Sequence, residues 1–279
     1  PARIFAARQS HARLDSLLAA FPDKKDILRL PAPAKALTVE NLVVSAPGQQ
    51  TPIIKRASFQ VTAGQALGVI GPSASGKTVL GRALVGIWQP AHGSVLLDGA
   101  SLAQWDPVEL GPHIGYLPQD VQLFDGTIAE NIARFAPDAA NPDIIAAAEA
   151  AGFHQAIVSL ADGYNTRIGP GHVQLSAGQR QRLGLARALY KSPFLIVLDE
   201  PNAHLDAEGE AALTEAIRSV RRRGGIAIVI AHRPSAITAV DRLMVINAGE
   251  IVAIGPKEEV LNRAVQPPAN VIQHPSARN

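Results

Sequence analysis

The sequence predicts an α/β protein built around a mostly parallel sheet with helices on both faces. Three short apolar runs support this prediction, because polar residues bound each run and helical stretches separate them; they cover residues 65–70, 194–198 and 226–231. Strands that are apolar throughout are typical of parallel sheets covered on both sides. A glycine-rich loop, GPSASGKT at residues 71–78, follows the first run directly. The first strand is therefore expected to lead into a phosphate-binding loop.

The composition limits the class of protein. With 279 residues, 47% hydrophobic and 18% charged, the chain can bury a substantial core. No apolar run approaches the roughly 20 residues that a membrane-spanning helix needs. The absence of cysteine excludes disulfides and thiolate zinc sites, and a net charge of +2 argues against a nucleic-acid partner. Because the chain begins with Pro1 and no secretory signal follows, we expect a piece of a longer chain.

The first 35 residues are expected to be a helix and a linker. Apolar residues at Leu14, Leu17, Leu18 and Phe21 predict a helix over residues 1–21, and prolines at 22 and within 31–35 predict a linker. This part holds seven Lys/Arg and three Asp. A solvated helix with an ordinary hinge explains that composition, and so does a basic segment that follows a membrane helix.

The next stretches complete the predicted organisation. Residues 36–59 have the pattern of β-strands, and residues 119–190 are mostly helical, including an alanine-rich helix over 144–151. Residues 264–279 contain three prolines and no periodicity, which predicts a disordered tail. We find no internal repeat.

The loop at residues 71–78 has the spacing of a nucleotide site. Gly71 and Gly76 allow a tight turn whose backbone N–H groups converge on a phosphate. Lys77 supplies charge for the β- and γ-phosphates, and Thr78 offers a hydroxyl to Mg²⁺. A helix over residues 78–87, starting near Lys77, adds its positive dipole end. A chance glycine turn would not be expected between a strand and a helix in this way.

Further polar residues follow the predicted strands. Asp199 and Glu200 come at the carboxyl end of the second apolar strand, where Asp199 suits the Mg²⁺ shell and Glu200 suits a base for the attacking water. Two solvated acids would be an equally good interpretation without the phosphate loop. His232 follows the third strand and is a candidate phosphate sensor, although a lone histidine there is more often a loop residue. Gln119 can reach both metal and water, but by itself it is a turn residue.

The stretch LSAGQRQR predicts the start of another helix. Ser176 and Gln179 have the spacing of a capping box, so a structural interpretation explains both residues. Capping does not explain the small pair Ala177 and Gly178, which lets a backbone approach closely. A helix N-terminus with small residues is suited to an anion. Because the phosphate loop already takes this chain's own nucleotide, we expect a nucleotide bound by another copy.

The order of these motifs resembles the nucleotide-binding domain of ABC transporters across residues 37–260. The motifs run phosphate loop, Gln119, LSAGQ, LDE, HLD and His232, and the combination is more specific than any one member. Finer stretches such as IGYLPQDVQLFDGTIAENIARF and LDEPNAHLDAEGEAAL resemble type I secretion exporters of the PrtD kind, which export proteases and lipases. The opening ARQSHARLDSLL is similar to the end of the last membrane helix and linker of those exporters.

The resemblance implies a fold and a set of roles. The fold is a P-loop NTPase (RecA-like) core with a mostly parallel sheet, an N-terminal antiparallel β subdomain and a helical signature subdomain at about 119–190; the whole domain covers residues 36–263. ATP would be cradled by Gly71, Pro72, Ser73, Ala74, Ser75, Gly76, Lys77 and Thr78. Mg²⁺ would be held by Thr78, Gln119 and Asp199. Catalysis would involve Glu200, His232, Gln119 and Lys77. The second copy's ATP would meet Ser176, Ala177, Gly178 and Gln179, with Asp206 at the dimer interface.

The same resemblance implies partners and a location. Two head-to-tail copies would sandwich two ATP molecules, closing on binding and opening after hydrolysis. Residues 1–35 would follow a transmembrane domain on the same chain, at the cytoplasmic face of a bacterial inner membrane. A membrane fusion protein, an outer-membrane channel and an exported protein would be further partners.

Four residues depart from the family pattern. The loop has Ala74 where glycine is common, and a methyl there matters if the residue needs a positive φ. Ala177 replaces the first signature glycine, Ala46 stands where an aromatic often stacks on adenine, and Pro170 stands where exporters usually have a glutamate facing the membrane domain.

Two alternative functions stay open at this point. The substitutions at Ala74 and Ala177 motivate a nucleotide-gated module that dimerises with little turnover. The presence of Lys77, Asp199, Glu200 and His232 argues against that interpretation, because degenerate sites usually lose one of these residues. A soluble ABC ATPase acting on DNA or ribosomes usually carries coiled-coil or tandem insertions, for which this chain has no room.

Overall fold

The computed structural model describes residues 8, 10–16, 30–231 and 237–265. Residues 8 and 10–16 are helical, within the helix predicted over 1–21. The remainder of that helix, most of the linker before Leu30, His232, and the tail from 266 onward lie outside the described residues. The predicted tail begins at residue 264, but helix α9 (Lys257–Val265) continues two residues into it.

A six-stranded sheet forms the centre of the fold. Its strand order is β12-β11-β3-β10-β9-β6, and every neighbouring pair is parallel except β11 with β12. The bounds are β3 (Ala66–Ile70), β6 (Ile114–Leu117), β9 (Leu195–Asp199), β10 (Ile226–Ile230), β11 (Arg242–Asn247) and β12 (Glu250–Pro256). This confirms the mostly parallel sheet, and β3, β9 and β10 are the three predicted apolar strands.

A second, antiparallel sheet precedes and flanks the phosphate loop. Its order is β2-β1-β4-β5, formed by β1 (Ala36–Ser45), β2 (Pro52–Thr62), β4 (His92–Leu97) and β5 (Ala100–Ser101). The strand pattern of residues 36–59 predicts β1 and β2. The other two strands are short and contain or follow glycine, and we did not predict them.

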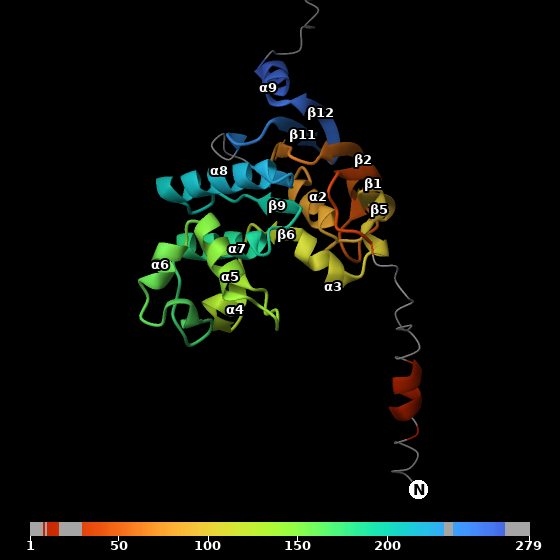
Figure 1. The fold of residues 1–279 in the computed structure, drawn as a ribbon. Coiled ribbons are helices and arrows are strands. Elements are labelled where there is room, and N and C mark those ends of the chain that lie inside the picture. Colours follow the sequence, from red (N-terminus) through yellow and green to blue (C-terminus); the bar gives the residue numbers. More distant parts are fainter. Residues whose placement is uncertain (1–7, 9, 17–29, 232–236, 266–279) are drawn as a thin grey trace, which may run out of the picture.

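Helices cover the parallel sheet and form a separate group beside it. Figure 1 shows α4, α5 and α6, coloured green, gathered on the side of the molecule away from β1 and β2. The helix bounds are α2 (Lys77–Leu84), α3 (Pro107–Leu110), α4 (Ile128–Ile132), α5 (Asn141–Ala150), α6 (His154–Val158), α7 (Ala177–Leu189) and α8 (Ala207–Arg222). The group also holds a small sheet of β7 (Gly126–Thr127) and β8 (Arg167–Ile168).

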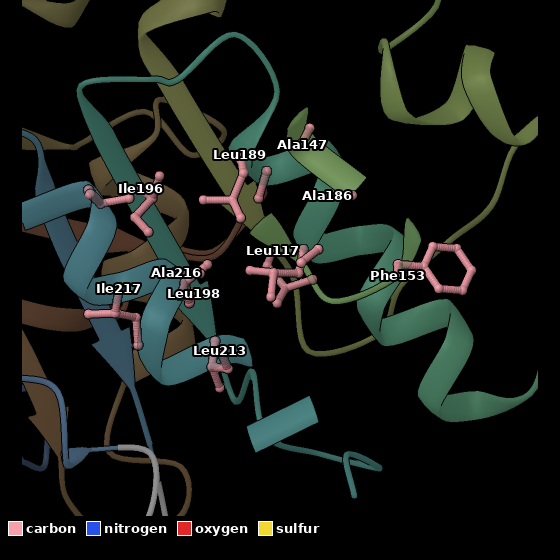
Figure 2. Close-up of a cluster of buried hydrophobic side chains, with 14 of the residues drawn as sticks. Leu117, Ala147, Phe153, Ala186, Leu189, Ile196, Leu198, Leu213, Ala216 and Ile217 are labelled. Atoms are coloured by element: carbon pink, nitrogen blue, oxygen red, sulfur yellow. The ribbon is translucent and has the colours of Figure 1, made fainter. Parts of the chain in front are cut away.

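Successive side chains of β9 enter two hydrophobic cores, one on each face of the sheet. Leu195 and Val197 pack with α2 and the antiparallel sheet, whereas Ile196 and Leu198 pack with α7 and α8. Figure 2 shows the second core, where Ile196 and Leu198 lie near side chains of α7 and α8. Fully burying one such side chain contributes about 1.5–3 kcal/mol. The strand is therefore apolar from Leu195 to Leu198 because both of its faces are covered.

Helix α2 is shorter than the helix predicted over residues 78–87. It ends at Leu84, and Gly86 adopts a φ of 78° while its N–H donates to the Ala83 carbonyl at 3.1 Å. A glycine in the left-handed conformation is a common way for a helix to end. The following N–H groups of Ile87 and Trp88 both donate to the Arg82 carbonyl, which completes the turn.

Candidate functional site

The glycine loop lies between the end of β3 and the start of α2, as the sequence predicts. Gly71 has a φ of 154° and Gly76 a φ of 100°, and both conformations favour glycine. A Cβ at Gly71 would lie 2.0 Å from the Ile246 carbonyl oxygen of β11, and one at Gly76 would lie 2.8 Å from Ile54 Cδ1 of β2. The backbone of β11 therefore requires glycine at position 71, and the positive φ favours glycine at position 76.

Lys77 forms hydrogen bonds with the backbone of its own loop. Its side chain is buried, and Nζ donates to the carbonyl oxygens of Gly71 at 3.0 Å and Pro72 at 2.7 Å. Burial lowers the pKa of Lys77, and the nearby carboxylates of Glu200 and Asp199 counteract that shift. The ammonium group thus lies between the loop and the two carboxylates, where it can contact a bound phosphate.

Asp199 is a buried carboxylate that lies near the Thr78 hydroxyl and the Lys77 ammonium group. The residue ends β9 with 0% exposure, and within the part of the chain that the structure describes neither carboxylate oxygen accepts a hydrogen bond of good geometry. Burial raises the pKa of Asp199, while the Thr78 hydroxyl and the charge of Lys77 counteract the shift. A buried carboxylate needs compensation, and carboxylate and hydroxyl oxygens are ligands that Mg²⁺ prefers. The donor set fits this cation.

Thr78 and Asp199 fit a metal ion that is also bound by a nucleotide. Among residues 8, 10–16, 30–231 and 237–265, no three His, Asp or Glu side chains gather in a cluster that could hold a metal. Mg²⁺ in nucleotide sites is usually bound through one or two protein oxygens together with phosphates and water. Thr78 and Asp199 would supply the protein share of such a site.

Glu200 and Gln119 are joined directly. The Gln119 side-chain Nε2 donates to Glu200 Oε2 at 3.1 Å, although the two residues are 81 positions apart in the sequence. Glu200 has a φ of 50°, a left-handed conformation that costs about 1–3 kcal/mol in a non-glycine residue and is typical of functional sites. Its backbone N–H donates to the Ile230 carbonyl at the end of β10. The sheet therefore holds Glu200 in a fixed, strained position next to Asp199.

The predicted capping box at the start of α7 is confirmed. Ser176 Oγ accepts from the Gln179 N–H at 3.2 Å, and Gln179 Oε1 accepts from the Ser176 N–H at 2.9 Å. A Cβ at Gly178 would lie 2.9 Å from the His204 carbonyl oxygen. The close backbone approach expected at this glycine is thus already made within the chain. Ala177 takes the first helical position of α7, where a methyl group causes no strain.

Asp206 lies beside these signature residues. It caps α8, accepting from the Gly209 N–H at 2.8 Å and from Arg182 Nη2 at 2.5 Å. The Gly209 N–H and the Arg182 guanidinium lower the pKa of Asp206. A cavity of about 380 Å³ is lined by Phe153, Ala156, Ser176, Gly178, Gln179, Arg182, His204, Asp206 and Glu208. No phosphate-loop residue lines it, so the signature residues and the loop face separate spaces within one chain.

Sequence reasoning missed Arg182 as a member of this cavity. Arg182 follows Gln179 within the same motif, SAGQRQR, and it also donates to the Gly152 carbonyl at 3.0 Å. A basic residue one helical turn after a capping box is a signal that could have identified it. Its two bonds tie the start of α8 to the end of α5.

Ala74 is strained, and replacing it with glycine should stabilise the protein. Its φ of 61° lies in the left-handed region, where alanine is disfavoured by about 1–2 kcal/mol. Because glycine also loses more chain entropy on folding, we expect Ala74→Gly to raise the free energy of unfolding by about 1 kcal/mol, measured by urea denaturation. As a control, Ala211→Gly in the exposed face of α8 should lower it by about 1 kcal/mol. Equal destabilisation by both changes would contradict the strain at Ala74.

No helix among the described residues is long and apolar enough to span a bilayer.

Comparisons with known proteins show which sequences this chain is similar to. The family model described as ABC transporter matches residues 54–203. The type I secretion system ATP-binding protein PrsD of Rhizobium meliloti (strain 1021) is 58% identical over 264 residues, covering 95% of this chain and 45% of that protein. The cyclolysin secretion/processing ATP-binding protein CyaB of Bordetella pertussis is 34% identical over 208 residues, covering 75% of this chain and 29% of that protein.

The fold also matches a solved structure. A bacterial Atm1-family ABC exporter with ATP bound superposes with a TM-score of 0.80 at 30% identity, covering 92% of this chain and 46% of the exporter chain. This chain therefore spans less than half the length of each of these three relatives.

Proposed function

Because this chain belongs to the ABC transporter family, we propose that it is the ATP-hydrolysing domain of an exporter that secretes proteins by the type I route. The observation that carries the proposal is the 58% identity to PrsD over 95% of the chain. The same identity favours this function over a soluble ATPase acting on DNA or ribosomes. The retained Lys77, Asp199 and Glu200 favour turnover over a nucleotide-gated module.

The residues of the site have distinct tasks in this proposal. The loop N–H groups and Lys77 bind the ATP phosphates, while Thr78, Asp199 and Gln119 would hold Mg²⁺, which neutralises charge on the phosphates when bound. Glu200 accepts a proton from the attacking water, and Gln119 orients the Glu200 carboxylate through the bond at 3.1 Å. His232, which lies outside the described residues, would contact the γ-phosphate.

A second copy completes each site. Ser176, Ala177, Gly178 and Gln179 would bind the partner's ATP, with Asp206 at the interface. The separate cavity beside these residues supports this assignment, because it is open to solvent and includes no loop residue of its own chain.

The remaining partners follow from the proposed exporter. A groove of about 720 Å³ near Gln119 exposes the ring pair Phe124 and Phe135 beside Arg187, and it would receive the chain's own transmembrane domain. The domain would work at the cytoplasmic face of a bacterial inner membrane, with a membrane fusion protein, an outer-membrane channel and an exported protein as partners. No nucleic acid is required.

The dependence of ATPase rate on protein concentration tests the proposal. If two copies build each site, the Mg²⁺-dependent rate per molecule should rise with concentration and then level off, measured by phosphate release. A rate per molecule that is independent of concentration would contradict the shared site. Bound ATP with no turnover at any concentration would favour the nucleotide-gated module instead.

A further inference from the structure

The segment that leads into β1 is docked against the domain. Pro33 is buried, and Leu30 packs against the hydrophobic core that includes Leu37 and Val61. The Lys35 carbonyl accepts from the Ala63 N–H at 2.7 Å. The linker predicted through residue 35 is therefore in contact with the domain from Leu30 onward.

One carboxylate accepts hydrogen bonds from the backbone N–H groups at the end of this segment. Asp98 Oδ1 accepts from the N–H groups of Lys35 at 2.9 Å and Ala36 at 2.8 Å, and Asp98 Oδ2 accepts from the N–H of Ala34 at 2.8 Å. The Asp98 N–H in turn donates to the Ala36 carbonyl at 3.0 Å. Hydrogen bonds to an ionised group are stronger than neutral ones. Four bonds thus join three consecutive residues to a single aspartate.

The position of Asp98 is set by the sheet and not by the segment it holds. Asp98 and Gly99 have φ values of 51° and 85° and form the two-residue turn between β4 and β5, as in hairpins with two left-handed residues. Strand β4 pairs with β1, with Leu97 opposite Leu37. Burial acts to raise the pKa of Asp98, but the three N–H groups outweigh burial and lower the pKa below its usual value. The carboxylate is therefore ionised at neutral pH.

We propose that residues 30–35 form a rigid strap, held by Asp98, that joins the preceding segment to the antiparallel sheet without a hinge. Prolines at 31 and 33 restrict the strap because their rings fix φ. Any movement of the antiparallel sheet then moves residues 30–35 with it, through β1 and the β4–β5 turn. The use of this movement for export rests on the proposed function, whereas the strap itself does not.

Amide hydrogen exchange of this chain tests the role of Asp98. Asp98→Gly removes the carboxylate and keeps the left-handed turn, so the amides of Ala34, Lys35 and Ala36 should exchange about tenfold faster or more. Asp98→Asn keeps one oxygen acceptor and places an NH₂ group opposite Ala34, so the Ala34 amide alone should exchange faster. Asp138→Gly, at another exposed aspartate, should change none of the three. Unchanged protection in Asp98→Gly would overturn the proposal.

Spin labels test whether the strap is rigid. Since the chain has no cysteine, Ala32→Cys and Glu40→Cys introduce unique labels on the exposed side of the strap and of β1. We expect a narrow distance distribution with Asp98 and a broad one with Asp98→Gly. A broad distribution in both would overturn the strap.

The test of the strap does not depend on whether the proposed function is correct. Among the described residues, Asp98 makes its hydrogen bonds to residues 34–36 and none to the nucleotide site, so the ATPase rate of Asp98→Gly should equal that of the unmodified chain. A chain without any ATPase activity would contradict the proposed function and leave both strap measurements valid.

Discussion

Replacing Glu200 with glutamine should lower the Mg²⁺-dependent ATPase rate by roughly 10²–10⁴-fold while leaving ATP affinity close to that of the unmodified chain. The carboxamide has the shape of the carboxylate and can still accept from Gln119 Nε2, but it cannot take a proton from water. Because ATP would then bind without being consumed, the population should shift toward the closed pair of copies. Phosphate release at saturating ATP and size-exclusion chromatography with ATP measure these two effects.

A control substitution shows whether the lower ATPase rate is specific to Glu200. Glu215→Gln alters an exposed glutamate on α8 that pairs with Arg222, and it should leave the ATPase rate unchanged. Full turnover by Glu200→Gln would show that another group is the base and would remove Glu200 from the assigned role.

Replacing Lys77 with alanine should weaken ATP binding by roughly 10- to 100-fold. A hydrogen bond to a charged group contributes about 1.5–3 kcal/mol, and about 1.4 kcal/mol corresponds to a tenfold change in affinity. The substitution also removes the two bonds that Nζ makes to the carbonyls of Gly71 and Pro72, so the loop loses order before any ligand arrives. Titration with a fluorescent ATP analogue measures the dissociation constant.

Two controls accompany the lysine change. Lys55→Ala removes a half-exposed lysine of β2 and changes the net charge equally, so it should leave affinity near its original value. Thermal unfolding of Lys77→Ala shows whether the domain is intact. Unaltered affinity in a folded Lys77→Ala protein would place the nucleotide elsewhere.

The sequence predicts the central strands well because burial on both faces leaves a strong pattern. Each residue of β9 and β10 is buried, and such continuous apolar runs between helices are easily recognised. Strand β6 has four residues and includes Gly115, so its pattern is too short to be distinctive. The hairpin of β11 and β12 was missed, although its Ala248–Gly249 turn, with φ values of 49° and 83°, is a recognisable hairpin signal.

The candidate site was predictable where one local motif defines it. The capping box at Ser176 and the loop from Gly71 to Thr78 depend on near neighbours in the sequence. The approach of His204 to Gly178 and the bond from Gln119 to Glu200 depend on segments far apart in the chain. A single sequence contains no direct signal for such contacts.

The strand order has a consequence for how the chain folds during synthesis. Strand β3, which leads into the phosphate loop, pairs with β10 and β11, and both lie more than 150 residues later in the chain. At roughly 5–20 residues per second, the ribosome needs roughly 8–30 s to deliver those partners after β3 has emerged. The antiparallel β1–β2 pair is complete much earlier. Nascent chains are thus expected to expose the apolar edges of β3 until β10 and β11 have been synthesised, which makes this interval the one in which a chaperone would be needed.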